Sequence, residues 1–274
     1  SGYESVILCD IKSETRNKVL KFCFDRSIRV YVTPKISDII MRGADDINLF
    51  DTPLLLCRNR GLTFEQRFIK RAGDIFMSSV GIIILSPIML VTAIIIKLYD
   101  GGPVLYKQKR STIGGRVFEI YKFRSMIVDA EKKSGAVLAS RHDDRITPVG
   151  KVIRRYRIDE FPQLFNILLG DMSVVGPRPE RPEIGEKYAK EMPEFRYRLK
   201  VKAGLTGYAQ VIGKYDTTAY DKLKMDMMYI EDYSLFLDIK LIMMTIKTMF
   251  QKDSSQGVTD ERGIGNKEEE KKSE

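Results

Sequence analysis

The sequence is short of the residues from which many active sites are built. Its 274 residues include a single histidine, His142, which excludes histidine-rich metal sites and argues against a Ser-His catalytic pair. Its three cysteines show neither CxxC nor metal-finger spacing, so we interpret them as reduced thiols of a cytosolic protein. No G-x-G-x-x-G follows a predicted strand, and the sequence therefore gives no support for a dinucleotide site.

Basic residues exceed acidic ones, 46 against 37, which gives a net charge of +9. This balance suits an anionic partner such as a membrane surface, a phosphate-bearing ligand or a nucleic acid. No basic stretch interleaved with aromatic residues accompanies the charge, so we predict no nucleic-acid partner. The chain has neither an initiating Met nor a signal peptide, and we expect it to be a piece of a longer protein.

A charge-free segment runs from Ile75 to Ile96, with Ser86-Pro87 at its midpoint and basic residues on both sides. A helix of this length could just cross the roughly 30 Å hydrocarbon core of a membrane. Proline inside a helix frees a backbone carbonyl, which the Ser86 hydroxyl could bind, and basic flanks favour the cytoplasmic side for both ends. The residues alone leave two alternatives open: a kinked single span, or a re-entrant helix that bends at Ser86-Pro87 and returns to the same side.

Around this segment the sequence predicts an α+β fold. Residues 1–57 alternate strand and helix patterns as βαβαβ, with the last strand at 52–58, and we interpret them as the remnant of a Rossmann-like α/β domain. We then predict an interfacial basic lead-in at 58–74, a membrane segment at 75–98, a mostly helical domain at 99–250 and a disordered polar tail at 251–274. Within the domain we expect a β-hairpin that turns near 113–115, helices at 129–133, 149–157, 162–169 and 234–250, and loops at 175–182 and 204–207.

Two adjacent carboxylates, Asp159 and Glu160, precede the predicted helix at 162–169. The positive end of a helix favours ionised carboxylates, but adjacent carboxylates repel, and a divalent cation is the usual way to keep both charged. Arginines at 154, 155 and 157 lie within five residues of the pair. A carboxylate nucleophile beside a metal ligand and guanidinium groups suits attack on phosphorus. The alternative is an ordinary solvated helix start.

Other basic residues could contact phosphate. Arg178 lies between two prolines, whose fixed φ angles limit how far its loop can move; the alternative is an exposed side chain on a surface loop. Lys122 and Arg124 alternate along a predicted strand and so point to one face, either toward phosphate oxygens or toward water. The glycine-rich run at 202–207 is typical of a turn that approaches a phosphate.

The order of several motifs resembles that of the monotopic phosphoglycosyl transferases, bacterial enzymes that begin glycan assembly on a polyprenyl-phosphate carrier. The resemblance covers roughly residues 62–250 and depends on the Ser-Pro of the apolar segment, YKFRSM, R-x4-DE-x-PQL-x-N, GDMS-x-VGPRP, GLTGYAQV and D-x2-YI-x3-S-x3-D. The chain departs from the family pattern at a few positions. Thr112 replaces a glycine, Phe161 a leucine, Lys202-Ala203 an Arg-Pro pair, and Tyr208 and Tyr233 tryptophans.

The resemblance implies transfer of a sugar-1-phosphate from a UDP-sugar to undecaprenyl phosphate, with Mg²⁺ and with release of UMP. It implies that Asp159 is a nucleophile that forms a covalent phosphosugar intermediate and that Glu160 binds Mg²⁺. It also favours the re-entrant helix, with Ser86-Pro87 as its turn. The substrate-binding residues that we predict are Arg154 at the lipid phosphate, Arg178 near the nucleotide-sugar, and Lys122, Arg124, Lys202 and Gln210.

The resemblance further implies the first membrane step of bacterial surface polysaccharide synthesis, at the cytoplasmic face of the inner membrane. It leaves open whether the protein is a homodimer. Two rival hypotheses are a non-catalytic anchor that binds anionic lipid at the membrane interface and a metal-dependent lipid pyrophosphatase. An anchor would explain the charge and the apolar segment, but not a carboxylate pair beside an arginine that lies between prolines.

Overall fold

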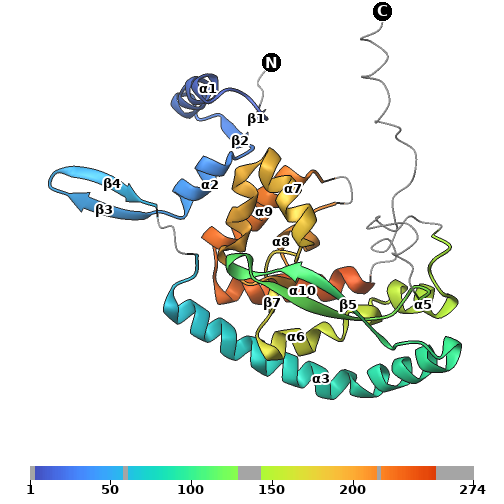
Figure 1. Cartoon of the computed structure of the whole chain (residues 1–274). Helices are drawn as coiled ribbons and strands as arrows, with labels where there is room; N and C mark the ends of the chain where they lie inside the picture. Colours follow the sequence, from blue (N-terminus) through green and yellow to red (C-terminus); the bar gives the residue numbers. More distant parts are fainter. Residues whose placement is uncertain (1–3, 58–60, 129–142, 215–216, 251–274) are drawn as a thin grey trace, which may run out of the picture. The chain divides into compact units, whose positions relative to one another are not determined.

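The computed structural model (Figure 1) describes residues 4–57, 61–128, 143–214 and 217–250. The chain forms two compact units, Ser1–Asn59 and Arg60–Glu274. The mixture of helices and strands confirms the predicted α+β class. The helix predicted at 129–133 and the polar tail predicted at 251–274 lie outside the described residues.

The first unit begins with a strand, a helix and a strand. β1 (Ser5–Leu8) and β2 (Arg29–Val32) pair in parallel, and α1 (Ser13–Asp25) connects them. α2 (Ile36–Arg42) follows, and it is tied to α1 by the guanidinium of Arg16, which donates to Asp38 Oδ1 at 2.8 Å. These four elements lie where the alternating pattern predicted them.

The third predicted strand does not join this sheet. β4 (Thr52–Leu56) pairs antiparallel with β3 (Asp45–Leu49), a strand that the sequence analysis missed, across a turn at Phe50-Asp51. Asp and Asn residues are disfavoured in strands, which hid β3, and so short a connection permits only antiparallel pairing. The prediction of a three-stranded βαβαβ fragment is therefore wrong, because the unit contains one parallel pair and a separate hairpin.

The second unit begins with α3 (Phe64–Asp100), one helix of 37 residues that joins the predicted lead-in to the predicted membrane segment. Thr63 and Gln66 form a capping box at its start. Gly101 ends the helix in the left-handed conformation, with a φ of 69°. Lys70, in the predicted interfacial lead-in, is buried and donates to Asp238 at 2.7 Å, so this end of the helix packs into the protein.

The middle of α3 runs through Pro87 without a break. The hydroxyl of Ser86 donates to the carbonyl oxygen of Ile83 at 2.8 Å. This carbonyl is the one whose N–H partner the proline removes, so the predicted hydrogen bond of Ser86 is confirmed. α3 is long and apolar enough to cross a membrane, and only 17% of its most apolar stretch is buried, unlike a core helix of a water-soluble protein.

The predicted hairpin is confirmed: β5 (Leu105–Ser111) and β6 (Val117–Phe123) pair antiparallel around a 3-10 turn, η1 (Ile113–Gly115). α6 (Gln163–Leu169) packs between β6 and α3. Two apolar clusters join these elements to α3, and their buried members are Phe118, Ile120, Leu164, Ile167 and Met172 in one and Met89, Ile96, Phe123 and Ile153 in the other.

A short parallel pair, β7 (Ser173–Val175) and β8 (Gly204–Thr206), occupies the region where a glycine-rich loop was predicted. A Cβ added at Gly204 would lie 2.1 Å from the backbone nitrogen of Gly176, so no side chain fits there. The prediction of a loop at 204–207 is wrong, because its glycine permits two backbones to approach closely rather than to turn.

The remaining elements of the second unit are helical. They are α5 (Pro148–Arg155), η2 (Ile158–Glu160), α7 (Pro182–Glu191), η3 (Pro193–Lys200), α8 (Tyr208–Val211), α9 (Ala219–Glu231) and α10 (Leu235–Phe250). The helices predicted at 149–157, 162–169 and 234–250 correspond to α5, α6 and α10. The sequence analysis made no prediction for α7 or α9.

Candidate active site

Asp159 and Glu160 lie in η2, a single 3-10 turn between α5 and α6. Arg157 has a φ of 55°, which is uncommon for a residue other than glycine, and this left-handed residue redirects the chain between α5 and η2. Pro162 then precedes the first residue of α6. The two carboxylates therefore project from a tight turn that two helices hold in place.

Asn166 fixes this turn relative to the hairpin. Its side chain is fully buried, its Oδ1 accepts from the backbone N–H of Tyr121 at 2.9 Å, and its Nδ2 donates to the carbonyl of Glu119 at 2.8 Å. Because the Asn166 amide bonds one backbone N–H and one backbone carbonyl of β6, it attaches α6 to that strand. Lys122, the next residue along β6, is thereby brought to Glu160.

Three cations converge on Glu160, whose side chain is only 14% exposed. Lys122 Nζ lies 3.2 Å and Arg178 Nη2 3.4 Å from Oε1, and Arg157 Nη1 lies 3.6 Å from Oε2. Burial by itself would raise the pKa of Glu160, but the charges of Lys122, Arg178 and Arg157 outweigh it and lower this pKa to about 2. Glu160 is therefore ionised throughout the physiological pH range.

Asp159 differs from its neighbour. Burial and the charge of Glu160 raise the pKa of Asp159 to about 6, against the lowering influence of Lys122 and Arg154. Adjacent carboxyl groups whose pKa values are driven apart are typical of residues with different chemical tasks. At neutral pH Asp159 is mostly ionised and more basic than an ordinary aspartate, which suits a nucleophile.

The loop that carries Arg178 is constrained by more than its two prolines. Each backbone carbonyl from 177 to 180 accepts a hydrogen bond. The donors are the N–H of Gly204 to Pro177 at 2.9 Å, Arg198 Nη2 to Arg178 at 2.9 Å, Arg110 Nη1 to Pro179 at 3.1 Å, and the N–H of Ser111 to Glu180 at 2.9 Å. The hairpin, η3 and β8 together therefore determine where Arg178 lies.

Arg198 is itself held in place. Its Nη2 lies 2.8 Å from Oδ2 of Asp226 in α9, and both side chains are less than 10% exposed. One guanidinium thus joins a buried carboxylate to the backbone of Arg178. The sequence analysis missed Arg198, although Asp226 is the first residue of the D-x2-YI-x3-S-x3-D motif.

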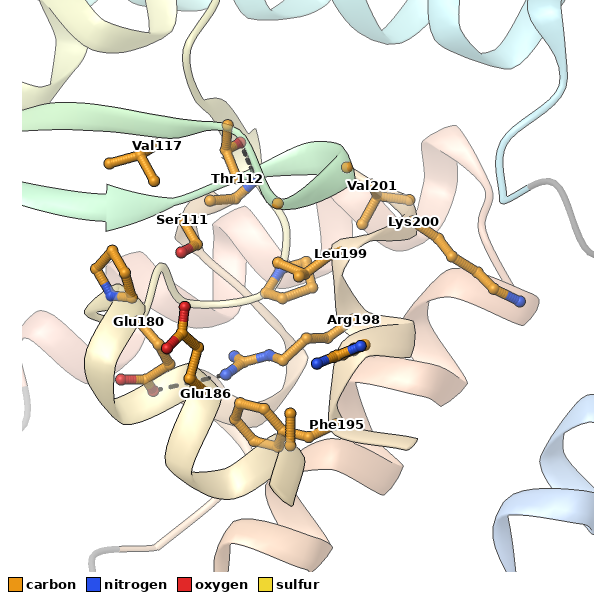
Figure 2. Close-up of a pocket in the computed structure, with 18 of the residues that line it drawn as sticks. Ser111, Thr112, Val117, Glu180, Glu186, Phe195, Arg198, Leu199, Lys200 and Val201 are labelled. Atoms are coloured by element: carbon orange, nitrogen blue, oxygen red, sulfur yellow. Dashed lines mark hydrogen bonds and ion pairs between the residues drawn. The ribbon is translucent and has the colours of Figure 1, made fainter. Parts of the chain in front are cut away.

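A pocket of about 520 Å³ lies beside the Arg178 loop (Figure 2). The turn of the hairpin, the loop, α7 and η3 form its walls, which include Thr112, Arg178, Gly185, Phe195 and Arg198. Arg178 therefore borders both this pocket and Glu160. The pocket is of a size that can hold a small molecule.

An apolar groove of similar volume lies between the second half of α3 and α5. Pro87, Val91, Ile95, Val152 and Ile158 are among its lining residues. Ile158 directly precedes Asp159 in η2. The carboxylate pair thus lies beside an apolar groove as well as beside the mixed polar pocket.

The structure brings some predicted site residues together and not others. Lys122, Arg154 and Arg178 all influence the pKa of Asp159 or Glu160, so they lie at the pair. Arg124 does not share the partner of Lys122, because its guanidinium binds Asp100 at the end of α3 and the carbonyl of Pro103.

Two further predicted residues lie in other surroundings. Burial and the neighbouring charge of Arg71 lower the pKa of Lys202, whose acidic neighbours are Asp74 and Asp171 rather than Asp159 and Glu160. Gln210 lies in α8, and within the described residues its buried Nε2 has no hydrogen-bond acceptor. Neither residue is brought to Asp159 and Glu160 by a contact in the described part of the chain.

A model of the bacterial sugar transferase family matches residues 65–252, a span that includes every element from α3 to α10. The chain belongs to this family. It is 46% identical over 185 residues to the UDP-N-acetylgalactosamine-undecaprenyl-phosphate N-acetylgalactosaminephosphotransferase of Aeromonas hydrophila, and 38% identical over 211 residues to the UDP-glucose:undecaprenyl-phosphate glucose-1-phosphate transferase of Klebsiella pneumoniae. These matches cover 66% and 75% of this chain.

The chain spans less than half the length of those two relatives, since the matches cover 44% and 43% of them. A third relative is shorter: the exopolysaccharide production protein PSS of Rhizobium leguminosarum bv. phaseoli is 39% identical over 186 residues, which are 65% of this chain and 93% of that protein. Family membership and the exposed apolar helix α3 together indicate a membrane-associated protein.

The carboxylate pair has the donor chemistry to hold a magnesium ion. The described residues contain no group of three His, Cys, Asp or Glu side chains for a metal, but Mg²⁺ is commonly held by one or two carboxylates together with phosphates and water. The cations around Glu160 lie 3.2 to 3.6 Å from its oxygens, farther than the roughly 2.7–2.9 Å of a tight charge-assisted hydrogen bond. Glu160 therefore retains capacity for a further positive ligand.

Proposed function

We propose that the protein transfers a sugar-1-phosphate from a UDP-sugar to undecaprenyl phosphate and releases UMP, through a covalent phosphosugar on Asp159. The observation that supports this most directly is the pair itself: a carboxyl group with a pKa of about 6 beside a carboxylate that three cations keep ionised. The relatives named for UDP-sugars and undecaprenyl phosphate support the choice of substrates.

The first half-reaction is a displacement at the sugar-bearing phosphorus. An oxygen of the Asp159 carboxylate forms a bond to that phosphorus, the bridging P–O bond of the diphosphate breaks, and its electron pair leaves on UMP. Lys122, Arg157 and Arg178 lie where they can offset charge that develops on the phosphate oxygens. A positioned nucleophile inside a basic site is most of what phosphoryl transfer requires.

The second half-reaction restores the aspartate. An oxygen of undecaprenyl phosphate attacks the same phosphorus, the P–O bond to Asp159 breaks, and the carboxylate is regenerated. The charge of Arg154 reaches Asp159, and this arginine is our candidate for the contact with the lipid phosphate. A Mg²⁺ ion held by Glu160 would neutralise the diphosphate while the nucleotide-sugar binds.

The apolar groove beside η2 supports a lipid acceptor. Its lining is almost entirely aliphatic and includes Pro87 of the predicted membrane segment as well as Ile158, which directly precedes Asp159. An isoprenoid chain in this groove would place its phosphate at the carboxylate pair, because the groove and the pair share η2. This arrangement suits a site at the level of the lipid headgroups.

Both ends of α3 are bound to the same folded unit, which supports a re-entrant rather than a crossing helix. Lys70 near its start pairs with Asp238 of α10, and Asp100 at its end binds Arg124 beside the hairpin. A helix that crossed the bilayer would place these ends on opposite faces. The basic flanks favour the cytoplasmic face of the inner membrane for both.

The covalent intermediate can be tested on the purified chain in lipid nanodiscs. Incubation with a panel of UDP-sugars and Mg²⁺, without lipid acceptor, should add one sugar-phosphate to the intact mass of the wild type and none to Asp159→Asn. Addition of undecaprenyl phosphate should remove the adduct and yield the lipid product. An absent adduct, together with full turnover by Asp159→Asn, would refute the mechanism.

The same experiment separates the two rival hypotheses. A non-catalytic anchor would bind the nanodiscs and release no UMP from any sugar in the panel. A lipid pyrophosphatase would release phosphate from a lipid diphosphate without any UDP-sugar. Only a transferase links UMP release to a lipid product in equal amounts.

A further inference from the structure

We infer that the pocket between the hairpin turn, α7 and η3 binds the leaving half of the nucleotide-sugar, the nucleoside monophosphate. This inference extends the proposed function, because it identifies where one part of that substrate lies. Its starting point is Arg178, whose guanidinium lies 3.4 Å from Glu160 and whose side chain also lines the pocket.

The displacement requires space for the leaving group, and the chemistry of the neighbouring cavities favours this pocket. In an in-line reaction the leaving oxygen departs on the side of the phosphorus opposite the attacking oxygen. The nucleoside monophosphate must therefore extend away from Asp159. Two spaces adjoin the pair: Arg178, which pairs with Glu160, lines the pocket, and Ile158, which precedes Asp159, lines the aliphatic groove. A charged nucleotide is excluded from the aliphatic groove by desolvation.

The chemistry of the walls fits a nucleotide. Four basic residues, Arg178, Arg196, Arg198 and Lys200, outnumber the two acidic ones, Glu180 and Glu186, in its lining. Phe195 and Leu199 contribute apolar surface for the faces of a base. Figure 2 shows the Arg198 side chain reaching across the pocket toward Glu180, while Lys200 extends away from it. A volume of about 520 Å³ is of the size that small-molecule sites have.

The site is also built before any ligand arrives. The Arg198 guanidinium is fixed by Asp226, and the carbonyls of the Arg178 loop are held by neighbouring elements. Prearranged walls reduce the ordering that a ligand must impose when it binds. Such a pocket favours a rigid, charged ligand over a flexible lipid chain.

Gly185 offers a direct test, because it lines the pocket and a Cβ at this position would meet no atom within 4 Å. Gly185→Leu therefore adds a bulky side chain at the pocket wall without a clash at Cβ, and in helix α7 leucine is a better helix former than glycine. Lys187→Leu is the matched control, since Lys187 is exposed on the same helix and does not line the pocket.

Two measurements on the full chain decide the matter. By calorimetry, UMP should bind the wild type and Lys187→Leu alike and Gly185→Leu at least tenfold more weakly, with the Tm of Gly185→Leu equal or higher. In turnover, Gly185→Leu should raise the KM for the UDP-sugar at least tenfold and leave the KM for undecaprenyl phosphate unchanged.

Equal UMP binding by Gly185→Leu and the wild type, or no UMP binding by the wild type at millimolar concentration, would overturn the inference while transfer activity could still stand. Selective loss of UMP binding in a protein that shows no transfer with any UDP-sugar would support the pocket and refute the proposed function. The two claims therefore fail separately.

Discussion

The backbone N–H of Ala203 donates a hydrogen bond to the hydroxyl of Thr112 at 3.1 Å. The same hydroxyl donates to the carbonyl of Asp171 at 2.9 Å, and Thr112 is almost fully buried. Thr112 and Ala203 both depart from the family pattern, in which position 112 is a glycine and position 203 a proline. A glycine lacks the hydroxyl and a proline lacks the N–H, so the two departures complement each other.

We expect Thr112→Val to lower the free energy of unfolding by about 1–3 kcal/mol, because it leaves a buried N–H and a buried carbonyl without a partner. Thr112→Ser, which keeps the hydroxyl, should cost less. In a double-mutant cycle, Thr112→Gly with Ala203→Pro should be less destabilising than the sum of the single changes. Denaturant unfolding measures all five variants, and strict additivity of Thr112→Gly and Ala203→Pro would show that the two positions are independent.

We expect kcat/KM to fall as the pH drops through about 6, because Asp159 must be ionised to attack and its pKa is raised to about 6. This fall is the acidic limb of the pH profile. Lys122 lowers this pKa, so Lys122→Met should move the limb to higher pH. Lys107→Met is the control, since Lys107 is on the same hairpin and pairs with the half-exposed Glu119. Profiles of kcat/KM between pH 5 and 8 test this, and a limb that does not move would contradict the assignment of Asp159.

We expect the Asp226–Arg198 pair to affect two quantities separately, the free energy of unfolding and the KM for the UDP-sugar. Asp226→Ala removes the nearer and more deeply buried of the two carboxylates beside the Arg198 guanidinium and leaves only Glu180 at 3.6 Å, which should cost about 3 kcal/mol. Replacing both residues, as Arg198→Met with Asp226→Leu, should recover much of that stability. The double variant should still show a raised KM for the UDP-sugar, because the carbonyl of Arg178 has lost its donor. A wild-type KM in a stable double variant would contradict the positioning role of Arg198.

The sequence predicted elements whose signals are local. The hairpin, α6 and α10 follow from alternation, turn residues and helical periodicity within a few positions. The carboxylate pair was visible because its two residues are adjacent. β3 was missed because its Asp and Asn residues give no strand signal, and only its pairing with β4 makes it one.

Partners that lie far apart in the chain could not be predicted in this way. Arg124 alternates with Lys122 and was predicted as a substrate-binding residue on the same face, yet its guanidinium binds Asp100, 24 positions earlier. Arg198 gave no signal at all, because its task depends on a carboxylate in α9 and a carbonyl in the Arg178 loop. Sequence spacing places side chains on a face, whereas tertiary packing decides what that face meets.

Removal of Mg²⁺ should abolish catalysis without unfolding the protein. Glu160 is already surrounded by Lys122, Arg157 and Arg178, so its charge is compensated in the absence of a metal. EDTA should therefore eliminate both UMP release and the adduct on Asp159 while the Tm stays within about 2 °C, and added Mg²⁺ should restore both activities. Glu160→Gln should fold normally, but added Mg²⁺ should not restore its UMP release or its adduct. A sharp fall in the Tm on addition of EDTA would identify a structural metal instead.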